Sequence, residues 1–322
     1  MPGPNITSAQ RAAAVAPQAA TAAMMVRPAC FGSNPQTQAS NRFQHDDAAI
    51  AQDSNGRACE EFNGLLRGLQ AAGVAVAAVQ DAAPPQCPDA IFPNNWVSLH
   101  ADGMVVLYPM LARNRRLERQ LDRVAGVAAA LGRRITRLLD LSHYETQGRH
   151  LEGTGSVVFD HTRRIAYACL SPRTELALLQ ELCDELGYRP CAFRATDAAG
   201  VPIYHTNVML AIGSGFVVVA AEAIDAADRE RVLQELAVGG RHLELIDRGQ
   251  MARFAGNVLE LQAGDGSRVL ALSQSAHEAL GSDGIGRLAR SVDRFVVAPI
   301  PTIEHLGGGS VRCMLAEVFL PS

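Results

Sequence analysis

The segment Asn207–Ala221, which reads NVMLAIGSGFVVVAA, contains the pattern on which the whole chain is built. Its two apolar runs are separated by Gly213, Ser214 and Gly215. Glycine between two apolar runs indicates a β-hairpin, because tight turns need backbone conformations that glycine adopts readily. A helical pattern follows at about residues 225–238. The segment therefore predicts a hairpin followed by a helix.

The same unit recurs along the chain with a period of roughly 50 to 60 residues, which indicates a repeat architecture. The last unit, Ser310–Phe319, has no partner strand after it, but the apolar run Met25–Phe31 could supply one. Five units with one split across the termini predict an α/β fold, a closed five-bladed propeller of ββαβ units around a central cavity. The other hairpins are predicted at 95–108, 155–170 and 257–272, with helices at about 48–72, 114–131, 173–187 and 275–292.

Length and local composition predict one domain. Residues 1–23 are rich in Ala, Pro, Gln and Thr, and they lack the basic start and apolar centre of a signal peptide. We therefore expect a disordered extension over 1–23 and a single catalytic domain over 24–322. No apolar run approaches the roughly 18 residues of a membrane helix.

Charge and residue usage exclude several classes of function. The net charge is -4 and no basic run occurs, which argues against a nucleic-acid partner. The chain contains no lysine, which excludes a Schiff base and the lysine of a phosphate-binding loop. Its seven cysteines form no C-x-x-C pair, so we expect neither a disulfide framework nor a zinc site, and a cytoplasmic location.

Three residues that precede predicted first strands carry the chemistry. In a radial array these segments meet near the axis, and they contain Glu152, His205 and Cys313. A thiol, a histidine and a third orienting group form the general pattern of an activated nucleophile. Gly309, in the glycine run 307–309, leaves room for a substrate beside the sulfur.

Each of these residues also has an ordinary structural explanation. A free cysteine such as Cys313 is often buried and inert, and His205 could be a core histidine with its hydrogen bonds satisfied. Glu152 could be a surface carboxylate, and Asn94 and Asn95 could simply form a turn. Their joint occurrence at equivalent positions of the repeat favours the catalytic interpretation.

These motifs resemble the pentein-fold superfamily that modifies guanidino groups. It includes arginine deiminases, dimethylarginine dimethylaminohydrolases and amidinotransferases. The resemblance rests on Glu152-Gly153, on His205-x-Asn207 and on the glycine-preceded Cys313, and it covers the chain from Met25. It implies Cys313 as nucleophile, His205 as general acid and base, and Glu152 as a group that holds the histidine and a substrate nitrogen. It also implies a covalent intermediate on sulfur, with no metal and no cofactor.

The departures from the superfamily pattern indicate the substrate. Asn95 and Asn207 stand where guanidinium-binding members usually have carboxylates, and Thr154 and Gly155 replace the usual Gly-Asp after Gly153. A guanidinium has only donors, whereas a neutral ureido group has a carbonyl acceptor as well. Asparagine offers both a donor and an acceptor, which favours citrulline. The segment Phe92-Pro93-Asn94-Asn95-Trp96 most resembles the citrulline-utilization hydrolase branch.

The sequence thus predicts a citrulline hydrolase that releases ornithine, ammonia and carbon dioxide. The alternatives are a dimethylarginine dimethylaminohydrolase or arginine deiminase, and then an amidinotransferase or a non-catalytic binding protein on the same fold. The expected partner is a small ureido or guanidino amino acid; a homo-oligomer is left open. The segment Ser33–Gln44 is a candidate substrate cover. The substrate-binding residues expected are Asn94, Asn95, Asn207, Gly309 and Arg312, with Arg312 or Arg164 for the α-carboxylate.

Overall fold

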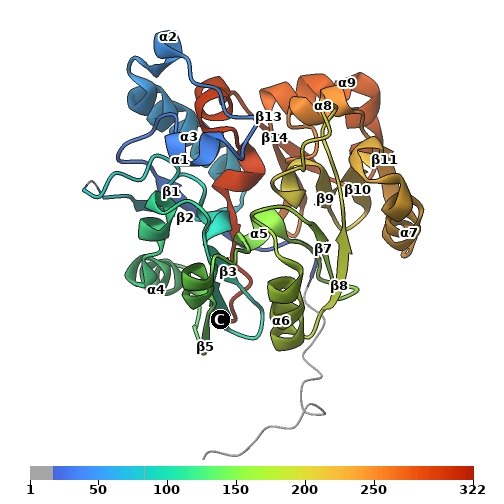
Figure 1. The fold of residues 1–322 in the computed structure, drawn as a ribbon, viewed down its shortest axis with the longest axis horizontal. Helices are drawn as coiled ribbons and strands as arrows, with labels where there is room; N and C mark the ends of the chain where they lie inside the picture. The colour runs from blue at the N-terminus through green and yellow to red at the C-terminus, as the bar shows by residue number, and fades with distance from the viewer. Residues whose placement is uncertain (1–16, 83) are drawn as a thin grey trace, which may run out of the picture.

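The computed structural model describes residues 17–82 and 84–322, whose strands form five separate three-stranded sheets (Figure 1). In each sheet the central strand pairs antiparallel with one neighbour and parallel with the other. The first sheet contains β15 (Ala316–Glu317), β1 (Ala22–Arg27) and β2 (Ala75–Gln80), and β1 is its central strand. The next two sheets contain β3 (Val97–Leu99), β4 (Met104–Leu107) and β5 (Arg137–Asp140), and β6 (Val158–Asp160), β7 (Ile165–Cys169) and β8 (Arg189–Phe193), with β4 and β7 central. The last two contain β9 (Leu210–Ile212), β10 (Phe216–Val219) and β11 (His242–Leu245), and β12 (Leu259–Gln262), β13 (Arg268–Ser273) and β14 (Arg294–Ala298), with β10 and β13 central.

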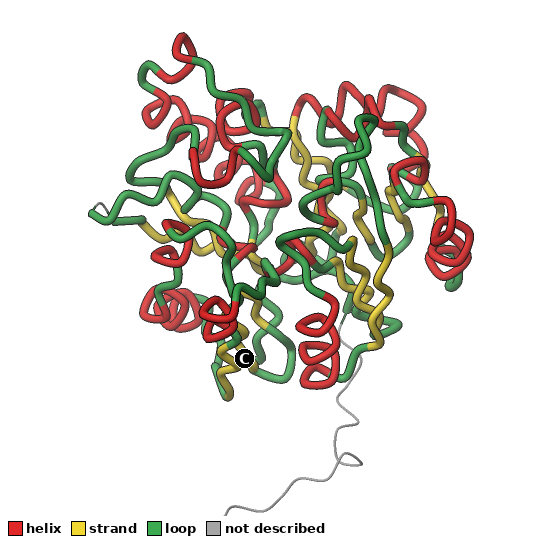
Figure 2. The backbone as a smooth tube through the Cα atoms, viewed as in Figure 1, coloured by secondary structure: helices red, strands yellow, loops and turns green. Residues whose placement is uncertain are grey.

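Each parallel pair of strands is joined through a helix, because parallel strands need a long crossover connection. These helices lie on the outside of the ring of sheets (Figure 2). They are α3 (Ser54–Ala71), α4 (Leu121–Ala130), α6 (Leu176–Leu186), α7 (Ala226–Ala237) and α9 (Gln274–Leu288). The short helices are α1 (Pro35–Gln38), α2 (Ala48–Ala51), α5 (Gly153–Ser156), α8 (Arg248–Ala252), η2 (Pro93–Asn95), η3 (Asn114–Glu118), η4 (Ser142–Gln147), η5 (Thr206–Val208), η6 (Ala221–Ala223), η7 (Ile303–Gly307) and η8 (Val311–Met314).

Burial falls from the inside of each sheet to the outside. The first and central strands are largely buried, and β9 and β10 are completely so. The third strands, such as β2 and β5, are largely exposed or half-buried. This gradient explains why the hairpins read as continuous apolar runs in the sequence, whereas the third strands carry more polar residues.

The chain termini close the ring, as the sequence predicts. Strand β15 pairs antiparallel with β1, with Ala23 opposite Glu317 and Met24 opposite Ala316. A single sheet therefore combines the last strand of the chain with its first two. Because this sheet also contributes the segment with Cys313, closure of the ring positions the predicted nucleophile. The α/β propeller with five blades is confirmed.

The boundary predicted at Met24 is too late in the chain. Residues 17–23 belong to the fold, since β1 begins at Ala22 and the Gln18 side chain is buried. The Gln18 amide donates to Phe159 O and Ile212 O and accepts from His161 N. The sequence did not indicate that residues 17–23 are ordered, because small alanines pack closely without giving a strong apolar pattern. Residues 1–16, also predicted as disordered, lie outside the described part.

Two predicted helices are interrupted. The helix expected over 48–72 is divided into α2 and α3 at Asp53, whose φ of 56° is left-handed. The helix expected over 114–131 begins as the 3-10 turn η3 and becomes α-helical only at Leu121. This turn directs Arg115 inward, where its guanidinium contacts Asn95.

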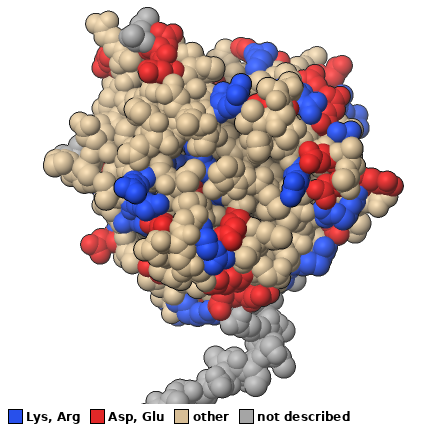
Figure 3. All heavy atoms as spheres, in the orientation of Figure 1, with Lys and Arg blue, Asp and Glu red and all other residues tan. Residues whose placement is uncertain are grey.

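The outer surface carries both signs of charge. Acidic and basic side chains are interspersed on the face that Figure 3 shows. In the residues that the structure describes, no helix is both long and apolar enough to cross a membrane. The same residues contain no group of three or more His, Cys, Asp or Glu side chains that could hold a metal ion.

Candidate active site

A small cavity lies where the segments preceding the first strands meet. The predicted residues Asn95, His205, Gly309 and Cys313 are in its wall, although they come from three different blades. The convergence follows from the closed ring, because equivalent positions of a radial repeat face the same axis. The remaining lining residues are Thr37, Asn41, Asp89, Phe92, Arg115, Arg173, Tyr204, Gly307 and Gly308.

The sulfur of Cys313 is contacted by two side-chain amides. Cys313 lies on η8 just before β15 and is 3% exposed. Its Sγ lies 3.3 Å from Asn207 Nδ2 and 3.3 Å from Asn257 Nδ2. Asn207 and Asn257 themselves lie just before β9 and β12, so both occupy the same place in their blades as Cys313 does in its own. A thiol or thiolate at this position thus faces amide N–H groups.

His205 and Glu152 form a buried pair next to the cavity. His205 Nε2 lies 2.8 Å from Glu152 Oε2, and Glu152 Oε1 accepts a hydrogen bond of 3.0 Å from Leu111 N. Oε2 also lies 3.3 Å from Arg173 NH1. Burial opposes ionisation of Glu152, but Arg173 and the hydrogen bond from His205 outweigh it and hold the carboxyl pKa well below its usual value.

The histidine is therefore neutral at physiological pH. Burial lowers the pKa of His205 to about 4, although the neighbouring Glu152 opposes this shift. An ionised carboxylate only accepts hydrogen bonds, so Nε2 carries the proton and donates a hydrogen bond to Glu152 Oε2. The other ring nitrogen, Nδ1, keeps a free lone pair and can act as a base.

Gly155 gives the pair the space that it needs. A Cβ built on Gly155 would lie 2.7 Å from His205 Nδ1 and would clash with Asn95 Nδ2. Gly155 is in α5, with a Glu152 backbone carbonyl accepting from its N–H. The glycine that replaces the more usual aspartate of the superfamily pattern thus allows Asn95 and His205 to approach each other.

A second group of side chains forms the charged wall of the cavity. Arg115 is 2% exposed, and its Nε and NH2 donate to both oxygens of Glu118, at 2.9 to 3.3 Å. Its NH1 donates to Asn95 Oδ1 at 2.8 Å. This bond fixes the orientation of the Asn95 amide, which then presents Nδ2 without a partner among the described residues.

Asp89 lies beside Arg115 in the same wall. Its Oδ2 accepts from Asn34 Nδ2 at 2.7 Å and from Thr37 Oγ1 at 3.3 Å, and it lies 3.7 Å from Arg115 Nε. Its Oδ1 is buried and has no hydrogen-bond partner in the described part of the chain. A buried carboxylate oxygen without a donor is costly unless a ligand supplies one.

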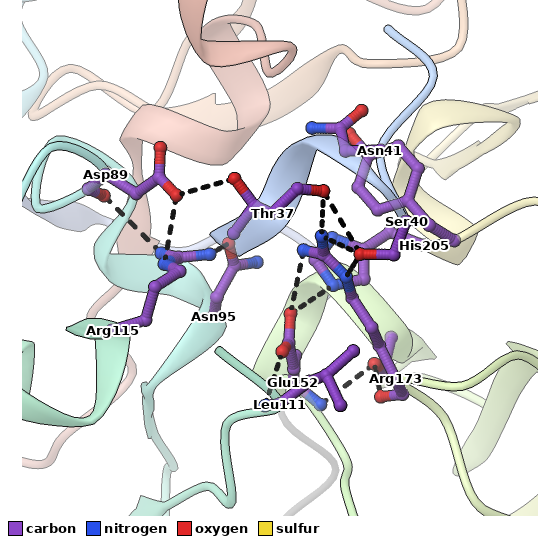
Figure 4. Close-up of polar contacts among 12 residues, drawn as sticks. Thr37, Ser40, Asn41, Asp89, Asn95, Leu111, Arg115, Glu152, Arg173 and His205 are labelled. Carbon is purple, nitrogen blue, oxygen red and sulfur yellow. Dashed lines mark hydrogen bonds and ion pairs between the residues drawn. The ribbon is translucent and has the colours of Figure 1, made fainter. Parts of the chain in front are cut away.

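Arg173 stands on the other side, between Glu152 and the Ser33–Gln44 segment (Figure 4). Its Nε and NH2 both donate to Ser40 Oγ, at 3.1 and 2.6 Å, and NH2 also donates to Thr37 O at 3.1 Å. These two nitrogens form the edge of a guanidinium that can bind a carboxylate with two parallel hydrogen bonds. In this structure the Ser40 hydroxyl lies against that edge.

The Ser33–Gln44 segment, predicted as a substrate cover, does reach the cavity. Asn41 Nδ2 donates to Gly308 O at 3.2 Å, and the Phe43 ring lies 5.9 Å from that of Tyr204. Tyr204 OH donates to the same Gly308 carbonyl at 2.6 Å. Gly308 has a φ of 62°, and a Cβ there would lie 2.6 Å from Asn41 Nδ2. The glycine run therefore lets the segment approach closely.

Three predicted residues lie elsewhere. Arg312 does not line the cavity, because its guanidinium donates to Leu315 O and pairs with Glu317 at 2.9 Å. Arg164 donates to Leu186 O and stacks over Tyr188, away from the site. Asn94 is buried but forms no part of the cavity wall. Neither Arg312 nor Arg164 therefore lines the cavity in which a substrate carboxylate would bind.

The sequence did not identify Asp89, Arg115, Arg173 or Asn257 as side chains of the site. Arg115 was read as the start of a helix, and Arg173 lies in the turn that precedes α6. Neither belongs to the repeated hairpin pattern. One signal was available for Asn257, since it stands in its blade where Asn207 stands in the preceding one.

Comparison with known proteins places the chain in a family. A family model described as N,N dimethylarginine dimethylhydrolase, eukaryotic, matches residues 27–320. The chain belongs to this family. It is thus a pentein of the guanidino-modifying superfamily. No curated protein sequence matches the chain.

Solved structures confirm the pentein fold. The N-terminal domain of ArgZ, an arginine dihydrolase from cyanobacteria, has a TM-score of 0.70 at 18% identity, covering 93% of this chain and 98% of that domain. The chain spans 41% of full-length ArgZ, at a TM-score of 0.71 and 18% identity, again with 93% of this chain covered. A dimethylarginine dimethylaminohydrolase bound to S-methyl-L-thiocitrulline has a TM-score of 0.64 at 14% identity, covering 92% and 99% of the two chains.

Proposed function

We propose that this family member hydrolyses citrulline to ornithine, ammonia and carbon dioxide through a covalent intermediate on Cys313. The observation that carries the proposal is the orientation of Asn95. Because its Oδ1 is occupied by Arg115, its Nδ2 is the atom left without a partner. That atom is a donor. It suits the carbonyl oxygen of a ureido group, whereas a guanidinium has no acceptor to offer it.

The charged wall supports an α-amino acid as substrate. The edge of Arg173 that contacts Ser40 is suited to an α-carboxylate, which would replace the hydroxyl with two charge-assisted hydrogen bonds. The unpaired Oδ1 of Asp89 is suited to an α-ammonium group. Binding of both charged groups at this wall would leave the neutral ureido end toward Cys313.

The reaction proceeds in two steps. The thiolate of Cys313 attacks the ureido carbon, the carbonyl electrons move onto oxygen, and Asn95 Nδ2 hydrogen-bonds to that oxygen. The terminal nitrogen takes a proton from solvent water and leaves as ammonia, which yields an S-carbamoyl cysteine. Water then attacks this carbon while His205 Nδ1 takes one of its protons. The C–S bond breaks, and the released carbamic acid decomposes into ornithine and carbon dioxide.

A second candidate is hydrolysis of arginine or N,N-dimethylarginine. The match to the dimethylarginine hydrolase family model favours it, and the arginine dihydrolase activity of ArgZ belongs to a protein of the same fold. Glu152 is the carboxylate that contacts His205 beside the cavity. However, it is already engaged by Arg173, His205 and Leu111 N. The geometry therefore favours the ureido substrate.

Side-by-side kinetics test the proposal. The purified protein is incubated with citrulline, arginine and N,N-dimethylarginine, and ornithine, citrulline and ammonia are measured. Cys313→Ser serves as the blank for each substrate. We expect ornithine and ammonia in equal amounts from citrulline. Turnover of arginine or dimethylarginine without any ornithine from citrulline would contradict the substrate assignment.

A further inference from the structure

Among the described residues, Asn257 is one of two whose side-chain amide contacts the sulfur of Cys313. Its orientation is fixed by a second hydrogen bond and by the packing of its backbone. It is fully buried, and it comes from the blade next to that of Asn207. In the described part of the chain, the two hydrogen bonds to Cys313 Sγ both come from side-chain amides. Changes to these amides should therefore change how readily the Cys313 thiol ionises.

The direction of the Asn257 amide is fixed by a second acceptor. Nδ2 of Asn257 donates to the backbone carbonyl of Asn207 at 2.8 Å, as well as to Cys313 Sγ at 3.3 Å. Rotating the amide by half a turn would place its oxygen against that carbonyl oxygen. The Asn207 side chain has no such second partner, since its Nδ2 contacts only the sulfur and its Oδ1 has no partner among the described residues. Asn257 can therefore present only its N–H group, and not its amide oxygen, to the sulfur of Cys313.

The backbone around Asn257 is also held tightly. Its N–H donates to Phe254 O at 2.8 Å. A Cβ on the preceding Gly256 would lie 2.7 Å from Val208 O and 3.1 Å from Met209 Cα. The segment therefore packs directly against the chain that carries Asn207. This contact holds the amide at the sulfur without a flexible linker.

The imidazole does not supply a positive charge for the sulfur. His205 is neutral, and its Nε2–H is directed to Glu152. A thiolate accepts hydrogen bonds far more strongly than a thiol, so a fixed N–H donor favours the ionised form. The ion is also the nucleophile in any thiol reaction.

We propose that Asn257 is a catalytic residue, a fixed amide donor that stabilises the Cys313 thiolate both before attack and when the sulfur leaves. The step is an ionisation, in which the sulfur loses its proton to the surrounding buffer and the amide N–H remains bonded to the anion. The inference rests on the proposed function only in taking Cys313 as the nucleophile. It concerns the free protein and needs no substrate.

The test is the pH profile of alkylation by iodoacetamide, in which the thiolate sulfur displaces iodide. Modification of Cys313 is followed by mass spectrometry of its peptide, so that the other six cysteines do not interfere. Asn257→Ala removes the donor and Asn257→Asp replaces it with a negative charge. We expect the midpoint of the profile to rise by about 1 pH unit in Asn257→Ala, with a rate about tenfold lower at pH 7, and by more in Asn257→Asp. Asn257→Ser keeps a shorter donor, should give an intermediate profile, and keeps the measurement available if the other variants do not fold.

Gln18→Ala is the matched control for stability. Gln18 is a buried amide with three hydrogen bonds, and none of them involves the site. This variant should lower the melting temperature and leave the midpoint unchanged. A midpoint that is the same in wild type, Asn257→Ala and Asn257→Ser would overturn the inference. Shifted midpoints in a protein that does not turn over citrulline would support the inference while the proposed substrate fails.

Discussion

The reactive end of the cavity and its charged wall are built from different side chains. The hydrogen bonds to Cys313 Sγ come from the side-chain amides of Asn207 and Asn257, and the neutral imidazole of His205 lines the same cavity. The other wall carries two buried guanidinium groups together with carboxylates such as Asp89. Both regions are buried to a similar degree. The difference between them is therefore one of charge.

This difference corresponds to the parts of an amino acid substrate. Every α-amino acid carries an ammonium and a carboxylate, so a charged wall suits any of them. Only the side chain distinguishes citrulline from arginine, and the amide-lined end lies where the side chain would react. Under the proposed function, the charge of the substrate side chain would be recognised near Cys313, and the α-amino acid end of the substrate at Arg173 and Asp89.

Asn95→Asp should shift the preference of the enzyme from citrulline toward arginine more than any other substitution considered. The new carboxylate keeps the hydrogen bond from Arg115 and places a second oxygen where Nδ2 was. We expect the ratio of kcat/KM for arginine to that for citrulline to rise about 1000-fold, since a donor is lost for one substrate and a charge partner is gained for the other. Asn95→Ala is the control, which should lower citrulline turnover without gain for arginine. An unchanged ratio in Asn95→Asp would remove this residue from substrate discrimination.

Arg173→Lys tests the charged wall. Lysine keeps the positive charge next to Glu152 but lacks the two-donor edge that contacts Ser40. We expect KM for citrulline to rise about 100-fold, which corresponds to the loss of about 3 kcal/mol of charge-assisted hydrogen bonding, while kcat changes much less. Arg149→Lys is the matched control, because Arg149 pairs with Glu175 outside the cavity. Equal KM values in the two variants would exclude Arg173 as the carboxylate anchor.

Gly155→Ala tests the fit of the reactive end. The added Cβ would clash with Asn95 Nδ2 and crowd His205 Nδ1, so both side chains must shift. A displacement of this size should lower kcat/KM for citrulline about 30-fold. Gly126→Ala in α4 is the control, since its Cβ would meet nothing within 4 Å and alanine favours the helix. A Gly155→Ala enzyme as active as Gly126→Ala would show that the close approach is not needed.

The sequence predicted the repeated fold because each blade is a local unit. A glycine turn such as Gly213–Gly215 between two apolar runs specifies a hairpin within about twenty residues of chain. Closure between β15 and β1 was also predictable, since one half-hairpin lacked a partner at each end. Catalytic candidates at equivalent positions, such as His205 and Cys313, followed from the same repeat, and the structure brings them to one cavity.

The charged wall was not predictable in this way. Arg115 and Arg173 lie in connections that differ from blade to blade, so no repeat marks them. Arg312 stands next to Cys313 in sequence, but neighbouring residues in an extended or 3-10 segment point in different directions. Its guanidinium therefore reaches Glu317 instead of the substrate. Long polar side chains find partners across the fold, and that choice depends on tertiary structure.

The pH dependence of kcat/KM tests whether His205 is neutral in the working range, and it should be the weakest of these effects. The folded pKa of His205, at about 4, is below the usual 6.5, so the imidazole is already a free base throughout the neutral range. Between pH 7 and pH 5.5, protonation of His205 should lower kcat/KM for citrulline less than twofold. Near pH 4, where His205 is protonated, kcat/KM should fall. The same shift predicts that stability is lost as pH falls from 6.5 toward 4, because the unfolded histidine then binds a proton that the folded one does not. Melting temperatures recorded at each pH separate this loss from the loss of activity. An acid limb centred near pH 6.5 in a protein that remains folded, at a pH where alkylation of Cys313 shows no midpoint, would mean that His205 is protonated near neutral pH.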